Sequence, residues 1–182
     1  MVPMNPFDIL TEAERVLLRG DMQTSLEFAQ LALEEFQYRR DNEGIAVAVA
    51  HNSSVYRQIF KQNASFYAIN KAQMDAMMCH ALVEREKLDR LRGFSYFQLG
   101  EVAMLLRNFE EAIFYLEKAV LSLHSRQLFE KGQYCFRLGE ANYKCHPLIK
   151  KVYGKNLMQS GLRQIYEDFL QKEQLVVRAS AT

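Results

Sequence analysis

Tryptophan is absent from this chain of 182 residues, and proline and glycine are scarce, with 3 and 8 copies. So few chain-breaking residues disfavour a protein built from many short strands and turns. The hydrophobic share of 49% excludes a chain too polar to form a core, and the length predicts about one domain. The 23 basic and 22 acidic residues give a net charge of +1, so we expect no strong overall attraction to nucleic acid or to anionic membranes.

The cysteines and histidines show no arrangement typical of catalysis or metal binding. Cys79, Cys135 and Cys145 are odd in number and lack CxxC spacing, so we expect buried thiols in a reducing compartment. The adjacent Cys–His pairs at 79–80 and 145–146 would point about 100° apart on a helix, which does not suit one metal ion or a nucleophile–base pair. Motifs of metalloproteases, nucleotide-binding proteins and serine hydrolases are absent. We therefore predict a protein that is not an enzyme and has no catalytic residues, no metal and no cofactor.

The first residues lack the basic segment and apolar run of a signal peptide, and no apolar run approaches the ~18 residues that span a bilayer. We therefore expect a cytoplasmic protein with no membrane partner and no nucleic-acid partner. Lysines at 144, 150, 151 and 155 form a modest basic cluster, which we interpret as a solvated face because acids lie nearby. An acidic partner is the alternative.

A helical pattern of small and large apolar residues recurs along the chain. Its spacing of i, i+3, i+4, i+7, i+10, i+11 and i+14 places every member on one helix face, with small residues at matching places. The clearest copy is Phe109, Ala112, Ile113, Leu116, Ala119, Val120 and Leu123, and an upstream copy is Met22, Ser25, Leu26, Ala29, Ala32, Leu33 and Phe36. A weaker copy between them is Ser65, Phe66, Ile69, Ala72 and Ala76. This repetition predicts stacked helices in which Ala112 and Ala119 face the partner helix of their own pair.

Each apolar stripe follows another apolar helix. Before the clearest stripe stand Tyr96, Leu99, Gly100 and Ala103, and the same spacing returns in Cys135, Leu138, Gly139 and Asn142. A glycine inside a helix costs about 1 kcal/mol relative to alanine. Glycine at the same place in two helices therefore predicts close contact with a neighbouring helix.

The segment from Tyr96 to His124 resembles a tetratricopeptide repeat, whose pattern is W-x2-L-G-x2-Y, then A-x3-F, then P. Tyr96 stands for the Trp, the Leu-Gly pair matches, and Ala112 with Leu116 supplies the small–large pair, whereas Ala103 replaces the Tyr and His124 the Pro. The resemblance covers about three quarters of the chain and stops after Pro147, where a divergent repeat or a capping helix would follow. It implies an all-α, right-handed superhelix of antiparallel helix pairs, about three to four repeats and eight helices, whose concave face binds peptides or protein segments.

Capping residues and turns divide the chain into one domain, residues 6–172, and a flexible tail, residues 173–182. The candidate caps are Thr11 with Glu14, Thr24 with Glu27, and Asn63, Asn108 and Ser125, with Pro147 in a first turn. The expected helices are 7–19, 23–39, 43–61, 64–82, 85–106, 109–123, 126–144 and 147–171. The last one is expected to break near Gly154 or at Ser160-Gly161.

The best candidate for partner binding is the next face of two first helices, beside the stripe assigned to the pair interface. The candidate groove residues are Phe94, Phe97, Glu101 and Met104, followed by Gln133, Phe136, Arg137, Glu140 and Tyr143. Aromatic residues dominate interface energies, so these rings would contact the partner while the charged residues orient it. The same rings would alternatively pack between repeats. Methionines at 74, 77 and 78 are interpreted as core packing or as cover for a lengthened helix, with an adaptable binding strip as the alternative.

The leading hypothesis is a non-catalytic protein- or peptide-binding module, a scaffold or regulatory adaptor with a concave aromatic groove. The alternative is a structural oligomerisation unit that self-associates through an exposed apolar stripe, in which case a homodimer is expected. An enzyme with a helical active site would have only Glu101, Glu140 and the histidines to work with.

Overall fold

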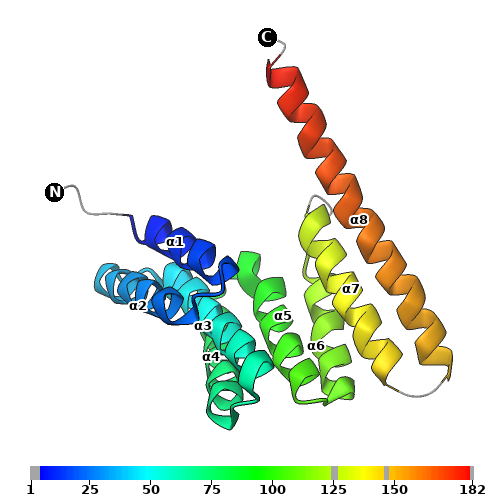
Figure 1. The fold of residues 1–182 in the computed structure, drawn as a ribbon, viewed down its shortest axis with the longest axis horizontal. Coiled ribbons are helices and arrows are strands. Elements are labelled where there is room, and N and C mark those ends of the chain that lie inside the picture. Colours follow the sequence, from blue (N-terminus) through cyan, green and yellow to red (C-terminus); the bar gives the residue numbers. More distant parts are fainter. Residues whose placement is uncertain (1–4, 124–126, 146–147, 181–182) are drawn as a thin grey trace.

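The computed structural model describes residues 5–123, 127–145 and 148–180, in which helices joined by short turns are the only regular structure. The helices are α1 (Pro6–Leu18), α2 (Met22–Arg39), α3 (Asn42–Asn63), α4 (Phe66–Arg85), α5 (Asp89–Leu105), α6 (Phe109–Leu121), α7 (Leu128–Lys144) and α8 (Leu148–Ser180) (Figure 1). The predicted all-α fold is confirmed, and the predicted helix boundaries differ from these by a few residues except at the end of α8.

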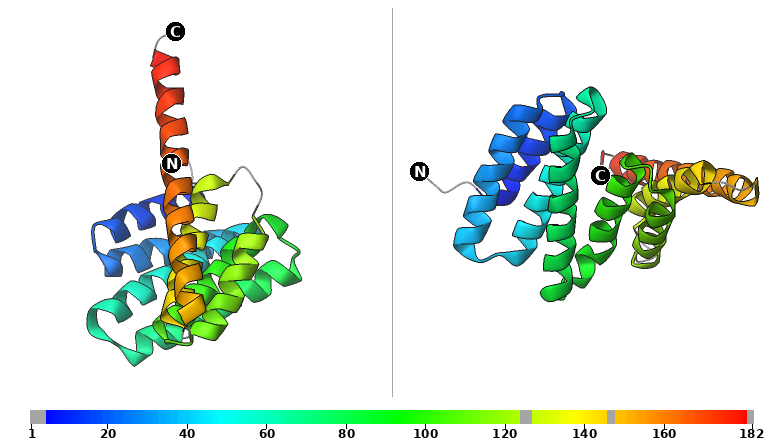
Figure 2. Two further views of the ribbon diagram at one scale, coloured as in Figure 1. Left: turned by 90° about the vertical axis from the view of Figure 1, so that its right-hand side faces the viewer. Right: turned by 90° about the horizontal axis from the view of Figure 1, so that it is seen from below.

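The helices form antiparallel pairs, α1–α2, α3–α4, α5–α6 and α7–α8, that stack side by side (Figure 2). The first helices of successive pairs also contact one another, α1 with α3, α3 with α5 and α5 with α7. Within the described residues, α2, α4 and α6 make no such contacts among themselves. The stack therefore curves toward α1, α3, α5 and α7, which line its inner face, while α2, α4 and α6 form its outer face. This arrangement confirms the predicted solenoid of helix pairs.

Side chains cap most helix starts, and one of the predicted caps is confirmed. The side chain of Asn108 accepts a hydrogen bond from the backbone N–H of Glu111 at the start of α6. Asn5, Asp21, Asp41 and Ser65 cap α1, α2, α3 and α4 in the same way. Each side-chain oxygen satisfies a backbone N–H that has no partner within the helix.

Three other predicted caps are wrong, because a polar residue nearby takes the role. Thr11 lies inside α1 and donates its hydroxyl to the Phe7 carbonyl oxygen, while Asn5 caps that helix ahead of Pro6. Thr24 lies inside α2 and donates to Asp21, its N-cap. Residue 63 ends α3 instead of starting α4. The candidates Ser125 and Pro147 lie outside the described residues.

The small residues of the repeated stripe lie where the sequence predicts. Ala112 and Ala119 are fully buried, and a Cβ atom at Gly93 of α5 would lie 3.1 Å from the Ala119 carbonyl oxygen. Gly100 faces Leu116 of α6, where a Cβ atom would come within 2.7 Å of the leucine Cγ. The predicted close contact between the helices of this pair is therefore confirmed. The predicted burial of the three cysteines, at positions 79, 135 and 145, is also confirmed.

The last helix, α8, is continuous over 33 residues, so the predicted break near Gly154 or Gly161 is wrong. These glycines instead bring the backbones of α7 and α8 together. A Cβ atom at Gly161 would lie 2.5 Å from the Gly132 carbonyl oxygen, and Gly154 meets Gly139 in the same manner. The predicted helix end near residue 171 is also wrong, since α8 continues to Ser180 and extends beyond α7 (Figure 1). The domain limit at 172 and a flexible tail over residues 173–182 stay predictions.

Large apolar side chains also lie on the outer surface. Met74, Met77 and Met78 of α4 are 62%, 57% and 51% exposed, so their interpretation as core packing is wrong. Ala72, Ala76 and Cys79 occupy the buried face of that helix instead. Within the part of the chain that the structure describes, no helix combines the length and apolarity needed to cross a bilayer.

Candidate binding groove

A pocket of about 390 Å³ opens on the inner face, between α5, α7 and α8. Its lining residues are Phe97 and Glu101 of α5, Gln133, Phe136 and Arg137 of α7, and Leu162 and Ile165 of α8. The ring of Phe97 stacks on Tyr134, with ring centroids 4.2 Å apart and an interplanar angle of 16°. This stacking holds the α5 wall in a defined position. Five of the nine predicted groove residues therefore meet in one pocket.

Two charged residues of the pocket wall, Glu101 and Arg137, belong to a chain of ion pairs. Arg137 pairs with Glu101 through two of its nitrogens, one of them 3.0 Å from a carboxylate oxygen, and Glu101 is 8% exposed. Arg137 also pairs with Glu140, which accepts a further bond of 2.5 Å from Lys144. Both carboxylates that the sequence singles out thus have cationic partners within the chain.

The pKa values of this network follow from its ion pairs. Burial opposes the charge on Arg137, but Glu101 and Glu140 keep the pKa of its guanidinium above the ordinary value. Burial likewise opposes ionisation of Glu140, but Lys144 and Arg137 keep the pKa of that carboxyl below its usual range. Arg137 and Glu140 therefore stay ionised near neutral pH, and the ion pairs of Arg137 hold it between α5 and α7.

Two further cations on α3 lie within reach of the same network. Arg57 is 7% exposed and donates a hydrogen bond of 2.5 Å to the Gln98 side-chain oxygen. Burial lowers the pKa of Arg57 to about 10, and the charge of Glu101 partly offsets that effect. Burial also lowers the pKa of Lys61, on which Glu101 and Arg137 act with opposite signs. Cations therefore outnumber carboxylates on this part of the inner face.

The remaining predicted groove residues lie outside the pocket. Phe94 packs against the buried cluster formed by the first two pairs, and Met104 is 6% exposed in the core beside Ala112. Tyr143 is 40% exposed, and the ammonium nitrogens of Lys151 and Lys155 lie 5.9 and 5.8 Å from its ring centroid. The alternative interpretation of packing between elements thus describes Phe94 and Met104, while Tyr143 lies near the start of α8.

Sequence reasoning missed the α8 wall of the pocket, Leu162 and Ile165. Within the described residues α8 contacts α7 and not α6, yet it shares the pocket with α5. The helix therefore stands on the inner side of α7 instead of continuing the outer layer. The signal for its close packing was the equal seven-residue spacing of Gly132 and Gly139 on α7 and of Gly154 and Gly161 on α8.

The two serine–histidine contacts elsewhere in the chain involve fully buried serines. Ser25 is fully buried, donates to the Ala13 carbonyl oxygen at 2.8 Å and bonds the His51 Nε2 at 2.9 Å. Ser95, also fully buried, bonds His80 at 3.0 Å. Burial raises the pKa of the Cys79 thiol to about 12, which disfavours the nucleophilic thiolate. Among the described residues, no three His, Cys, Asp or Glu side chains gather where a metal ion could sit.

No family model matches the sequence, and no curated protein matches it. Among solved structures, the chain is similar to BtubC (BKLC) from P. vanneervenii, with 17% identity, a TM-score of 0.60, and coverage of 98% of this chain and 68% of that chain. Similarity at this identity shows a shared helical fold alone. The chain is also aligned with the MamA RS-1 ArsTM double mutant at 17% identity over 96% of this chain and 98% of that one, but the TM-score of 0.33 supports no conclusion.

Proposed function

We propose that this chain is a non-catalytic helical repeat module that binds a segment of a partner protein in the inner groove between α5, α7 and α8. The observation that carries the proposal is the pocket of about 390 Å³ with apolar walls. Leu162 is 55% exposed there, beside the half-buried ring of Phe136. Concave apolar sites with a few fixed polar groups are typical of binding sites.

The resemblance to tetratricopeptide repeats supports a peptide or protein as the partner. The small and large residues of the resembling segment lie at its helix contacts, as in Gly100 against Leu116. Members of that family bind extended segments on the face formed by their first helices, which here are α1, α3, α5 and α7. We place the protein in the cytoplasm as a scaffold or adaptor, in keeping with its buried thiols.

The charges around the groove suggest which segments bind. Arg57, Lys61 and Arg137 stand against Glu101 and Glu140 in this region, and both carboxylates already pair with Arg137. A basic partner group would therefore have to compete with an internal ion pair. We propose a partner segment with apolar side chains for the pocket and acidic groups for the surrounding cations. Its affinity should fall as the salt concentration rises.

The test is photo-cross-linking followed by a matched pair of variants. A benzophenone amino acid at Gln133, which is exposed at the pocket, should cross-link a partner that can be sequenced. Phe136→Ala should then lower the affinity for that partner about 30-fold, because truncating an aromatic anchor costs about 2 kcal/mol. Phe114→Ala is the control, since Phe114 is 53% exposed on α6. Equal affinity of the Phe136→Ala variant and the unchanged protein, with both folded, would remove the inner groove as the binding site.

Self-association is a second candidate function, favoured by the surface of α8. Leu162, Tyr166 and Phe169 are 55%, 61% and 54% exposed and lie at i, i+4 and i+7 on one face of that helix. A second copy would cover this stripe in a structural oligomer. Light scattering between micromolar and hundred-micromolar protein separates the two functions. A dimer that Phe169→Asp dissociates would favour the second candidate, and a monomer throughout favours the first.

A further inference from the structure

A second groove lies on the outer face, between α2 and α4, with α3 as its floor. Two pockets of about 450 and 330 Å³ open over this floor, the first lined by α2 and α3 and the second by α2, α3 and α4. The floor residues Ile45, Val49, Asn52 and Tyr56 follow one another at i, i+4, i+7 and i+11, so they occupy one face of α3. The groove exists because the second helices do not contact one another.

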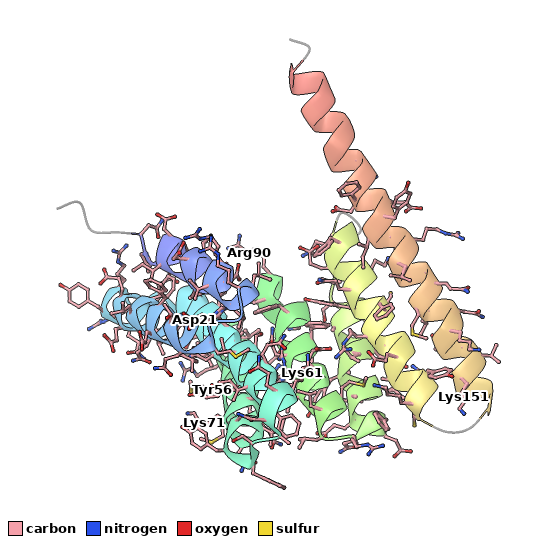
Figure 3. The ribbon with its side chains drawn as sticks, viewed as in Figure 1. Asp21, Tyr56, Lys61, Lys71, Arg90 and Lys151 are labelled. Atoms are coloured by element: carbon pink, nitrogen blue, oxygen red, sulfur yellow. The ribbon has the colours of Figure 1, made fainter. Side chains whose placement is uncertain are left out.

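This outer groove is on the opposite side of α3 from the inner groove. Ser54 and Arg57, on the other face of α3, reach Gln98 of α5. Figure 3 shows Tyr56 and Lys71 together on one side of α3 and α4, with Lys61 on the side of α5. A ligand in the outer groove therefore does not compete with one in the inner groove.

Asn52 replaces a core leucine of the repeat. Val49, Asn52, Ser53 and Tyr56 have the same spacing as the α5 motif, so Asn52 corresponds to Leu99 and Ser53 to Gly100. Ser53 faces α4, where its hydroxyl donates to the Ala72 carbonyl oxygen, just as Gly100 faces α6. The matching leucines, Leu99 and Leu138, are 8% and 4% exposed and pack in the core. The outer groove thus has an amide at a position where α5 and α7 have leucine.

The side-chain oxygen of Asn52 has no hydrogen-bond partner within the described residues. Its Oδ1 atom is buried and accepts no hydrogen bond. Buried amide oxygens without a partner are rare in proteins because they have lost water and gained nothing in return. The terminal torsion of asparagine is soft, so rotation about it can turn this oxygen toward the pocket that Asn52 lines. A side-chain amide can then both donate to and accept from a peptide group.

We propose that the outer groove binds an extended, apolar segment of a partner protein whose backbone pairs with the amide of Asn52. A helical segment fits less well, because its backbone groups already bond one another and would leave Asn52 unpaired. The floor from Ile45 to Tyr56 is about 17 Å long at the helical rise of 1.5 Å per residue, which about five extended residues would span. Glu27 lines one end and Arg85 the other, so a basic and an acidic residue should flank the apolar ones.

The walls of the groove suit apolar side chains of variable shape. Leu26 and Leu31 line it from α2, and Met78 lines it from α4. Met74 and Met77 lie beside Met78 on the exposed face of α4. Methionine is flexible and polarisable, and it is common on surfaces that accept several related ligands.

The experiment uses two capped peptides, acetyl-Lys-Val-Leu-Val-Glu-amide and acetyl-Glu-Val-Leu-Val-Lys-amide, titrated into the full chain labelled for nuclear magnetic resonance. One of them should cause saturable shifts of the Asn52 side-chain amide and the Met78 methyl group. N-methylation of its backbone should weaken binding about fivefold, the equivalent of one hydrogen bond. Shifts confined to residues of the inner pocket, or no saturable shifts with either peptide, would overturn the proposal. So would shifts at Asn52 that follow protein concentration alone, because a second copy would then fill the groove.

Two variants make the assignment specific. Asn52→Leu restores the residue of the matching repeats, so we expect an equal or higher melting temperature and about fivefold weaker peptide binding. Met78→Glu places a charge on the exposed wall and should weaken binding as well while the protein stays folded. Phe136→Ala, in the inner pocket, should leave binding of these peptides unchanged, so the two grooves are tested separately. Undiminished binding by a folded Asn52→Leu or Met78→Glu variant would contradict the proposal.

Discussion

The α5–α6 and α7–α8 pairs carry a glycine at the same place of the repeat and use it differently. Gly100 of α5 makes room for a side chain, Leu116 of α6. Gly139 of α7 makes room for backbone, because a Cβ atom there would lie 2.5 Å from the Gly154 carbonyl oxygen and 2.7 Å from the Met158 nitrogen. The second glycine of the contact, Gly154, comes from α8 itself.

This difference shows that one sequence position can support two helix-pair geometries. Where only one helix supplies the small residue, the partner's side chain fills the space, as in ordinary ridge-and-groove packing. Where both helices supply glycines at a spacing of seven, their backbones meet twice along the interface. The α7–α8 contact is the closer of the two, and α8 lines the inner pocket instead of the outer face.

The largest expected effect comes from adding one methyl group to the closer contact. Gly154→Ala would place a Cβ atom 2.7 Å from the Tyr143 backbone nitrogen and against the Gly139 carbonyl oxygen, so the helices must separate. We expect a loss of about 3 kcal/mol in unfolding free energy, as for strong overpacking of a core. Chemical denaturation measures it. The sign is the test, since alanine in a helix without such contact would stabilise by up to about 1 kcal/mol.

Gly100→Ala is the matched control for this prediction. Its Cβ atom would meet the Leu116 side chain, which can change rotamer, so the loss should be smaller than for Gly154→Ala. Equal losses for the two variants would show that the pairs do not differ in the way the structure describes.

The sequence predicts those features of the fold that depend on residues within one helix, and it does not predict those that depend on contacts between two helices. The stripes through Ala112 and Ala119 are periodic over one helix, so their buried face could be predicted. Within its own helix, a glycine such as Gly154 or Gly161 predicts a break. Their role depends on Gly139 and Gly132 across the interface, which a pattern within one helix does not contain.

A smaller effect is expected from overpacking the α5–α6 pair. Ala112→Leu adds three carbon atoms at a fully buried position beside Ala103 and Met104. We expect a loss of about 2 kcal/mol, the middle of the range for enlarged core residues. Lys118→Leu, which introduces the same residue on the exposed face of α6, should leave the melting temperature unchanged. A stable Ala112→Leu protein would mean that the α5–α6 contact tolerates expansion more readily than its buried alanines indicate.

The candidate groove could be predicted in part, because some of its residues follow from the periodicity of single helices. Phe97, Phe136 and Arg137 lie on helix faces left over after the pair interface was assigned, and they meet at the pocket. The ion pair between Arg137 and Glu101 joins residues 36 apart in sequence, so the prediction that these charges orient a partner could not include their pairing with each other. Leu162 and Ile165 were missed because only the close α7–α8 contact brings them to the groove.

The smallest expected effect is a dependence of stability on pH that comes from the first half of the solenoid. His51 is 6% exposed, and burial lowers its pKa from 6.5 to about 4. The unfolded chain therefore takes up a proton near pH 6.5, whereas the folded protein resists it until about pH 4. The stability contributed by neutral His51 is complete above pH 6.5 and is lost as the pH falls toward 4. Linkage gives a loss of about 1.4 kcal/mol at pH 5.5 relative to pH 7.5.

Urea unfolding of the full chain at the two pH values measures this loss, and His51→Gln identifies its source. Glutamine is neutral at both values and can donate to the Ser25 hydroxyl, which itself donates to the Ala13 carbonyl oxygen. The variant should lose most of the difference between pH 7.5 and 5.5. His80, whose pKa burial also lowers, accounts for a remainder. Because these histidines lie on α3 and α4, Gly154→Ala should lower stability at both pH values without changing their difference. A loss of the pH dependence in the Gly154→Ala variant would show that the α7–α8 pair and the histidine-containing α3–α4 pair do not contribute to stability independently.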